Sequence, residues 1–139
     1  MELIEITDVT LYYDLWDITG KELRLCNEIR KKTRKMYVMT DHSISIAGIS
    51  VVYDSIHERT IKDQRAYLSY FVVKPEYRNK GIGTQILRQV IHSLQSSNYR
   101  EATIQVEKDN IDAYRLYRRE GFELILKEYD ESVLLLKKL

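Results

Sequence analysis

The sequence predicts one domain that mixes strands and helices, an α/β (α+β) fold with the element order β-α-α-β-β-β-α-β-α-β-β. Runs rich in β-branched and aromatic residues alternate with segments whose apolar residues recur at helical spacing. The chain has 139 residues and one proline, and it contains no repeat or low-complexity stretch. These features argue against a linker, so we expect a single domain over residues 1–139.

The N-terminal half is expected to form four strands and two short helices. Residues 2–6 open with a strand, and residues 36–40 and 44–53 are strand-like runs joined by a hairpin-like turn at residues 41–43. A further strand is expected at residues 67–73. Between the first two strands, apolar residues at helical spacing predict two short helices that are broken near Gly20: Leu11, Leu15 and Ile18, then Leu23, Leu25, Cys26 and Ile29.

The C-terminal half alternates helices with strands. A strand is expected at residues 102–107, a helix at residues 110–120, and two closing strands at residues 122–128 and 132–137. Before the strand at residues 102–107, a helix is expected whose apolar residues form one stripe that should pack on the sheet: Ile82, Ile86, Leu87, Val90, Ile91 and Leu94.

Composition narrows the function classes. Lysine and arginine number 22 against 21 acidic residues, so the charge balance gives no general argument for nucleic acid or an anionic membrane as partner. The single Cys26 cannot form an internal disulfide and is expected in the core, and we find neither a signal peptide nor a membrane span. His42, His57 and His92 show no metal-ligand spacing. We therefore expect a cytoplasmic protein that binds a small or locally recognised partner and holds no metal.

A glycine-rich turn is the most informative feature of the chain. A strand-like run ends at Pro75 and turns through Arg78-x-x-Gly81-x-Gly83 into the amphipathic helix. Glycine allows close backbone approach, and the start of a helix offers N–H groups and positive potential to an anion. The spacing fits neither a P-loop, because Lys80 precedes the glycines, nor a dinucleotide fingerprint, because Ile86 stands at the third glycine. An ordinary helix-start turn is the structural alternative.

A second motif about thirty residues downstream makes the signal specific. It reads Asn110-x-x-Ala113-x-x-Leu116-Tyr117-x-x-x-Gly121-Phe122, and the first reads Val73-x-Pro75-x-Tyr77-Arg78-x-x-Gly81-x-Gly83, with Leu87 one residue late. Together they resemble the central motifs of the GNAT superfamily of N-acetyltransferases, and the close match covers residues 67–122.

The resemblance implies a mixed, mostly antiparallel sheet flanked by helices, and acetyl-coenzyme A (acetyl-CoA) as the co-substrate. Central strands of that family separate at their ends, and the pantetheine arm pairs there with strand backbone, which belongs to Phe71 and Val73 in this chain. Core packing is the structural alternative for both residues. The pyrophosphate would take amide hydrogens from Asn79, Lys80, Gly81, Gly83 and Thr84, with charge added by Arg78 and Lys80.

The second motif implies a proton donor. Asn110 precedes an apolar-periodic run and is a favoured helix N-cap, and the resemblance adds a contact to the cofactor arm. Tyr117 lies two helical turns later on the same face, so we assign it as the general acid that protonates the departing thiolate. Tyr114 is off that line and is expected in the core or wall. Gly121 is expected to end the helix in a left-handed conformation.

The general base is left open by the sequence. Subfamilies with a defined catalytic Glu place it where this chain has Tyr67 or Gln105, and neither is a carboxylate. A water relay, Glu107 and Asp54 are the alternatives.

The acceptor is expected to be a primary amine of a small molecule or a peptide. Aromatic walls could come from Tyr12, Tyr13 and Trp16 and charge from Asp14 and Asp17, although a helix with its usual apolar and polar faces is the preferred explanation of these residues. The basic run at residues 30–35 is expected at a solvated helix end, or against an acidic acceptor. The rival function is a non-catalytic CoA-binding sensory or regulatory module, a nucleic-acid module is disfavoured by the charge balance, and a homodimer is a further expectation.

Overall fold

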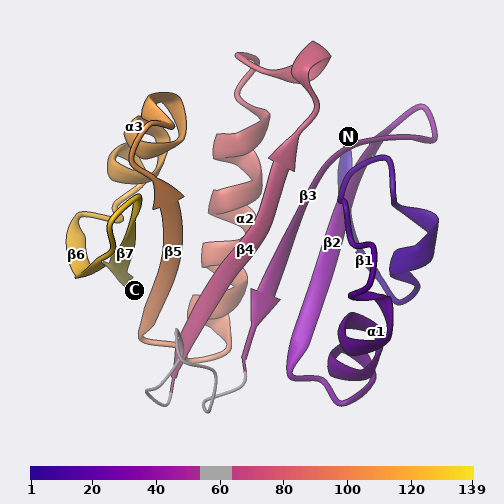
Figure 1. Cartoon of the computed structure of the whole chain (residues 1–139), viewed down its shortest axis with the longest axis horizontal. Helices are drawn as coiled ribbons and strands as arrows, with labels where there is room; N and C mark the ends of the chain where they lie inside the picture. The colour runs from indigo at the N-terminus through magenta and orange to yellow at the C-terminus, as the bar shows by residue number, and fades with distance from the viewer. Residues whose placement is uncertain (54–63) are drawn as a thin grey trace.

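A computed structural model describes residues 1–53 and 64–139 of the chain. Its strands form one seven-stranded sheet in the order β1-β2-β3-β4-β5-β7-β6 (Figure 1). Every neighbouring pair is antiparallel except β4 and β5. The mixed, mostly antiparallel sheet is therefore confirmed. Its strands are β1 (Glu2–Ile6), β2 (Arg34–Asp41), β3 (Ile44–Val52), β4 (Arg65–Val73), β5 (Glu101–Glu107), β6 (Leu124–Glu128) and β7 (Ser132–Lys138).

Helices cover both faces of this sheet. The long helix α2 (Ile82–Ser96) and the shorter α3 (Ile111–Arg119) share one core with one sheet face, and the whole expected stripe of α2 is buried in it. The N-terminal 3-10 turn η1 (Val9–Leu11) and helix α1 (Glu22–Arg30) form a second core on the opposite face. Each face of the sheet is therefore shielded by a different part of the chain.

The β2–β3 hairpin has the expected turn. Asp41 pairs with Ile44, and the two residues between them, His42 and Ser43, have φ values of 50° and 67°. Two left-handed residues in succession match the right-handed twist of the flanking strands, so a two-residue loop suffices.

The first of the two expected N-terminal helices is replaced by turns. Only the three residues of η1 are helical, and Leu11, which was expected on the apolar stripe, is 71% exposed. Short polar side chains close local turns here instead: Asp8 accepts from the Thr10 amide at 3.0 Å, and Asp17 accepts from the Thr19 amide at 3.4 Å. Such side-chain bonds compete with a continuous helix.

The basic run at residues 30–35 is only partly solvated. Arg34 begins β2 and is 3% exposed, with its Nε 3.2 Å from Glu28 of α1 and its Nη1 2.5 Å from the hydroxyl of Ser50. The expectation of a solvated helix end is therefore wrong for Arg34, because β2 carries this residue onto the sheet face that α1 covers.

None of the helices in residues 1–53 and 64–139 has the length and the apolar character that a membrane span requires.

Candidate active site

The two parallel strands of the sheet pair only over their first residues. β4 and β5 are in register from Arg65 opposite Glu101 to Leu68 opposite Ile104, and the pairing ends there. β4 continues along β3 to Val73, and β5 continues along β7 to Glu107. The strands therefore diverge toward their ends (Figure 1). Beyond Leu68, no described strand pairs with the edge of β4 that faces β5, and backbone groups on such an edge can bind an extended ligand.

A β-bulge in β4 accompanies this divergence. Gly48 of β3 is opposite Val72 whereas Ser50 is opposite Ser69, so β4 carries one extra residue, and within it Tyr70 has a φ of 50°. An aromatic residue in that conformation is strained. Sequence reasoning missed the bulge, because no glycine or asparagine marks it.

An ion pair closes the other end of the parallel pair. The guanidinium of Arg65 lies 3.3 Å from the carboxylate of Glu101, and their side chains are only 8% and 12% exposed. This contact holds the two strands together where they are paired, so the separation is confined to the end near α2 and α3.

The glycine-rich turn leads into α2 with left-handed backbone at two positions. Asn79 has a φ of 61° and Gly81 a φ of 79°, and Gly81 is the N-cap of α2 without any side-chain cap. Successive turns of this kind direct backbone N–H groups to one side and form a cradle for an anion. The first turn of α2 therefore offers uncapped donors beside the open edge of β4.

The two glycines have different roles. An added Cβ at Gly81 would meet nothing within 4 Å, so this glycine is required for its backbone conformation. At Gly83 a Cβ would lie 3.2 Å from Leu116 Cδ2 and 3.4 Å from Phe71 Cζ. Gly83 therefore allows the start of α2 to pack closely on β4 and α3. From the sequence, this glycine is explained instead by the close approach of a ligand to the backbone.

Three cationic side chains surround this turn. Arg78 donates from Nε to the Val73 carbonyl at 2.9 Å, and Lys80 Nζ lies 5.5 Å from the centre of the Tyr77 ring. The third is Arg119 of α3, whose Nη2 is 3.3 Å from the hydroxyl of Thr84. Sequence reasoning missed Arg119. A basic residue in the last turn of a helix is explained by the helix dipole, so it gave no separate signal.

The ends of α3 are fixed by local hydrogen bonds. Asn110 caps the helix by accepting from the Ala113 amide at 3.3 Å, as expected. At the other end Gly121 has a φ of 100°, its amide donates to the Arg118 carbonyl at 3.1 Å, and the Phe122 amide donates to the Tyr117 carbonyl at 2.9 Å. This is a Schellman motif. It fixes the backbone of Tyr117 directly.

Tyr117 is enclosed by aromatic rings. Its side chain belongs to the main core and is 7% exposed, with its ring centre 6.1 Å from Phe71 and 6.4 Å from Phe122. Burial, and secondarily the neighbouring phenol of Tyr67, raise the pKa of Tyr117 to about 12. The phenol is therefore protonated at neutral pH and can donate a proton.

The two positions at which related subfamilies place a catalytic Glu hold neutral polar groups in this chain. Tyr67 lies near enough to affect the titration of Tyr117, and Gln105 donates from Nε2 to the hydroxyl of Ser132 at 2.7 Å. Glu107 is exposed at the end of β5, and Asp54 lies outside the described residues.

The expected acceptor residues have structural partners. Trp16 is 4% exposed in the core, and Tyr12 packs edge-on against it with ring centres 6.3 Å apart. Tyr13 hydrogen-bonds Glu22, Asp14 lies 2.8 Å from Lys74, and Asp17 closes the turn described above. The structure therefore gives no specific support for an amine pocket built from these side chains.

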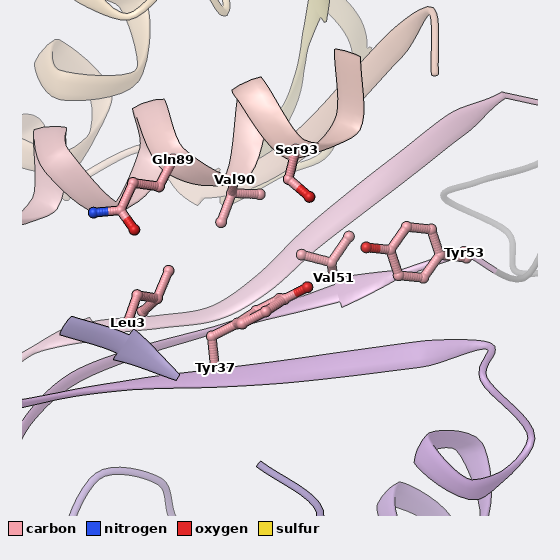
Figure 2. Close-up of a pocket in the computed structure, with 7 residues that line it drawn as sticks. All are labelled: Leu3, Tyr37, Val51, Tyr53, Gln89, Val90 and Ser93. Carbon is pink, nitrogen blue, oxygen red and sulfur yellow. The ribbon is translucent and has the colours of Figure 1, made fainter. Parts of the chain in front are cut away.

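A separate hollow lies on the α2 side of the sheet. It has a volume of about 150 Å³, and Figure 2 shows the phenols of Tyr37 and Tyr53 side by side beneath α2. Burial raises the pKa of both phenols above the usual range. None of the predicted site residues lines the hollow, which is formed by Leu3, Tyr37, Val51, Tyr53, Gln89, Val90 and Ser93.

Residues 1–53 and 64–139 contain no group of three His, Cys, Asp or Glu side chains that could hold a metal ion. His57, one of the three histidines, lies outside this range.

Comparison with known proteins matches residues 4–122 to the sequence model described as "Acetyltransferase (GNAT) family". N-alpha-acetyltransferase 30 of Xenopus laevis is 32% identical over 75 residues, which are 54% of this chain and 27% of the relative. N-alpha-acetyltransferase MAK3 of Arabidopsis thaliana is 31% identical over 81 residues, 58% of this chain and 41% of the relative. The chain thus spans less than half the length of these curated relatives.

Solved structures share the fold at low sequence identity. PaiA N-acetyltransferase from Thermoplasma acidophilum, solved in complex with coenzyme A, superposes with a TM-score of 0.78 at 18% identity and full coverage of both chains. Ribosomal-protein-alanine N-acetyltransferase from Brucella melitensis gives 0.75 at 17% identity, also with full coverage of both chains.

Proposed function

Because the chain belongs to the Acetyltransferase (GNAT) family, we propose that it transfers an acetyl group from acetyl-CoA to a primary amine of a small molecule or a peptide by direct attack. One observation carries this proposal. The open edge of β4, the uncapped start of α2 and the protonated phenol of Tyr117 lie around the same separation of β4 from β5.

Residues on the open edge and the turn would bind acetyl-CoA. Backbone groups of Phe71 and Val73 pair with the amides of the pantetheine arm, as a further strand would. Amides from Asn79 to Thr84 receive the pyrophosphate, with charge from Arg78 and Lys80. Within residues 1–53 and 64–139, Arg78 hydrogen-bonds only through Nε, to the Val73 carbonyl, so its two terminal nitrogens can donate to phosphate. Asn110 accepts from the Ala113 amide through its oxygen, and its amide nitrogen is left to donate to the cofactor arm.

Tyr117 supplies the proton to the leaving sulfur. The amine nitrogen forms a bond to the thioester carbonyl carbon, the carbon–sulfur bond breaks, and the sulfur takes up one proton from the phenol. A thiol in water has a pKa of ~8.5, below that of Tyr117, but burial raises the pKa of a thiol in the same way. The phenol donates to the sulfur as its negative charge develops, and it recovers a proton from the amine by way of solvent.

The neutral groups at Tyr67 and Gln105 favour an α-amine as the acceptor over a lysine-like amine. A free amino terminus has a pKa of roughly 7.8, so holding it neutral at pH 7 costs about 1 kcal/mol, whereas a lysine-like amine of pKa ~10.4 costs about 5 kcal/mol. The first acceptor can react with help from water alone. The similar proteins named N-alpha-acetyltransferase point to the same acceptor class.

A non-catalytic CoA-binding module is the rival function. It is favoured by the absence of a carboxylate at Tyr67 and Gln105, where related subfamilies place a catalytic Glu. It predicts the same cofactor contacts. It gives no reason, however, for a buried, protonated phenol beside the open edge of β4.

The test is release of free thiol from acetyl-CoA across a panel of short peptides with free α-amines, amino acids, polyamines and aminoglycosides. Tyr117→Phe should lower kcat by about 100-fold or more, because it removes the proton donor and keeps the ring. Tyr114→Phe, which alters a half-buried phenol of the same helix, is the matched control and should turn over like wild type. Acceptor-dependent release that is equal in Tyr117→Phe would exclude this general acid. Binding of acetyl-CoA without release to any acceptor would favour the rival module.

A further inference from the structure

Trp16 connects the N-terminal turns to β4, the strand proposed to pair with the cofactor. Its side chain is 4% exposed, and its indole Nε1 donates to the carbonyl of Tyr70 at 2.7 Å. The ring lies directly on Gly48 of β3, where an added Cβ would overlap Cζ2 of the indole. The hydrogen bond between Trp16 and Tyr70 joins residues that are 54 positions apart in the chain.

The carbonyl that Trp16 binds belongs to the strained residue of the bulge. Tyr70 has a φ of 50°, which is unfavourable for a residue with a large side chain, so its neighbours must hold it there. Its ring lies 5.7 Å from the guanidinium of Arg34, which Glu28 and Ser50 fix in turn. The indole N–H and the guanidinium therefore act on the carbonyl and on the ring of the same residue.

The bulge determines which face of the sheet the side chains of Phe71 and Val73 occupy. A one-residue change of register turns every following side chain of a strand to the opposite face. With the extra residue present, Phe71 packs beneath Gly83 and beside Tyr117. Without it, Phe71 and Val73 would face the core that α1 covers. The N–H and C=O groups that point to the open edge of β4 would then belong to the alternate residues of the strand.

We propose that Trp16 is a positioning residue for acetyl-CoA, because its indole N–H holds the Tyr70 bulge in the geometry that opens β4 to the pantetheine arm. The proposal rests on the proposed function, in that it needs the cofactor to lie along β4. Trp16 acts through Tyr70 and touches no reacting atom.

The experiment is a double-mutant cycle read by the Kd for coenzyme A, with wild type measured first. Trp16→Phe keeps an aromatic ring over Gly48 and removes the N–H, and Tyr70→Asn supplies a residue that adopts positive φ more readily. Trp16→Phe should weaken coenzyme A binding about tenfold, since it leaves the buried carbonyl of a strained residue without its donor. In the Tyr70→Asn background the same change should weaken binding less than about threefold, because the bulge then needs less support.

A matched control separates positioning from general loss of stability. Leu15→Ala removes a buried neighbour in the same core that makes no hydrogen bond to β4, and it should lower the Tm without changing the Kd for coenzyme A. If Trp16→Phe does not fold, Gly48→Ala displaces the indole while keeping its N–H, and it should weaken binding in the same way.

The outcomes distinguish the two claims. A wild-type chain that does not bind coenzyme A would refute the proposed function and the inference that rests on it. Normal binding by wild type with equal binding by Trp16→Phe would overturn the inference alone. An equal loss in the wild-type and Tyr70→Asn backgrounds would overturn it too, because Trp16 would then act only by filling space.

Discussion

Alkaline unfolding should report the protonated phenol of Tyr117 directly. Burial raises the pKa of this group from 10.0 to about 12 in the folded protein, whereas the unfolded chain keeps the ordinary value. Between these two pH values the folded state holds a proton that the unfolded state has lost. The stabilisation is therefore complete below pH ~10 and is lost as the pH rises through ~12.

The size of the effect follows from the shift. Two pKa units correspond to about 3 kcal/mol of unfolding free energy in total, of which about 1 kcal/mol is lost by pH 11. Tyr117→Phe has no phenol to ionise, so it should not show this component. Other groups titrate in the same range, but those distant from Tyr117 contribute equally to both proteins and cancel in the difference.

The assay is urea unfolding of wild type and Tyr117→Phe at pH 8 and at pH 11. Wild type should lose about 1 kcal/mol more than the variant between the two pH values, and Tyr114→Phe should follow wild type. Equal losses in wild type and Tyr117→Phe would show that this phenol ionises at an ordinary pH, and the reasoning from burial would fail.

Substitutions at the two glycines of the turn should change the free energy of unfolding by different amounts, as measured by thermal unfolding. Gly81→Ala should destabilise the fold by about 1–2 kcal/mol, since its φ of 79° strains any residue with a Cβ, and Gly81→Asn should cost less; equal losses would contradict a conformational role. Gly83→Ala should stay within about 1 kcal/mol of wild type, because the gain in helix propensity opposes the 3.2 Å contact with Leu116, and a loss above about 2 kcal/mol would show that the packing cannot adjust.

Much of the site could be predicted from the sequence because it is built from local signals. The Asn110 cap joins residues three positions apart, and the left-handed Gly121 ends α3 through hydrogen bonds that reach back five positions at most. The stripe of α2 follows the helical repeat, and the turn at Gly81 requires the one residue without a side chain. In each case the interacting groups are close in the chain, so the pattern specifies the geometry.

The tertiary structure alone decided how these parts meet. Contacts between distant segments produce the bulge at Tyr70, the burial of Trp16 and Arg34, and the approach of Arg119 to Thr84. The residue types at these positions give no local sign of such contacts. Tyr117 could be named from its motif, but its raised pKa depends on Phe71 and Phe122, which enclose it only in the folded chain. Hydrogen bonding within a few residues is fixed by local sequence, whereas burial and desolvation arise only when strands and helices pack together.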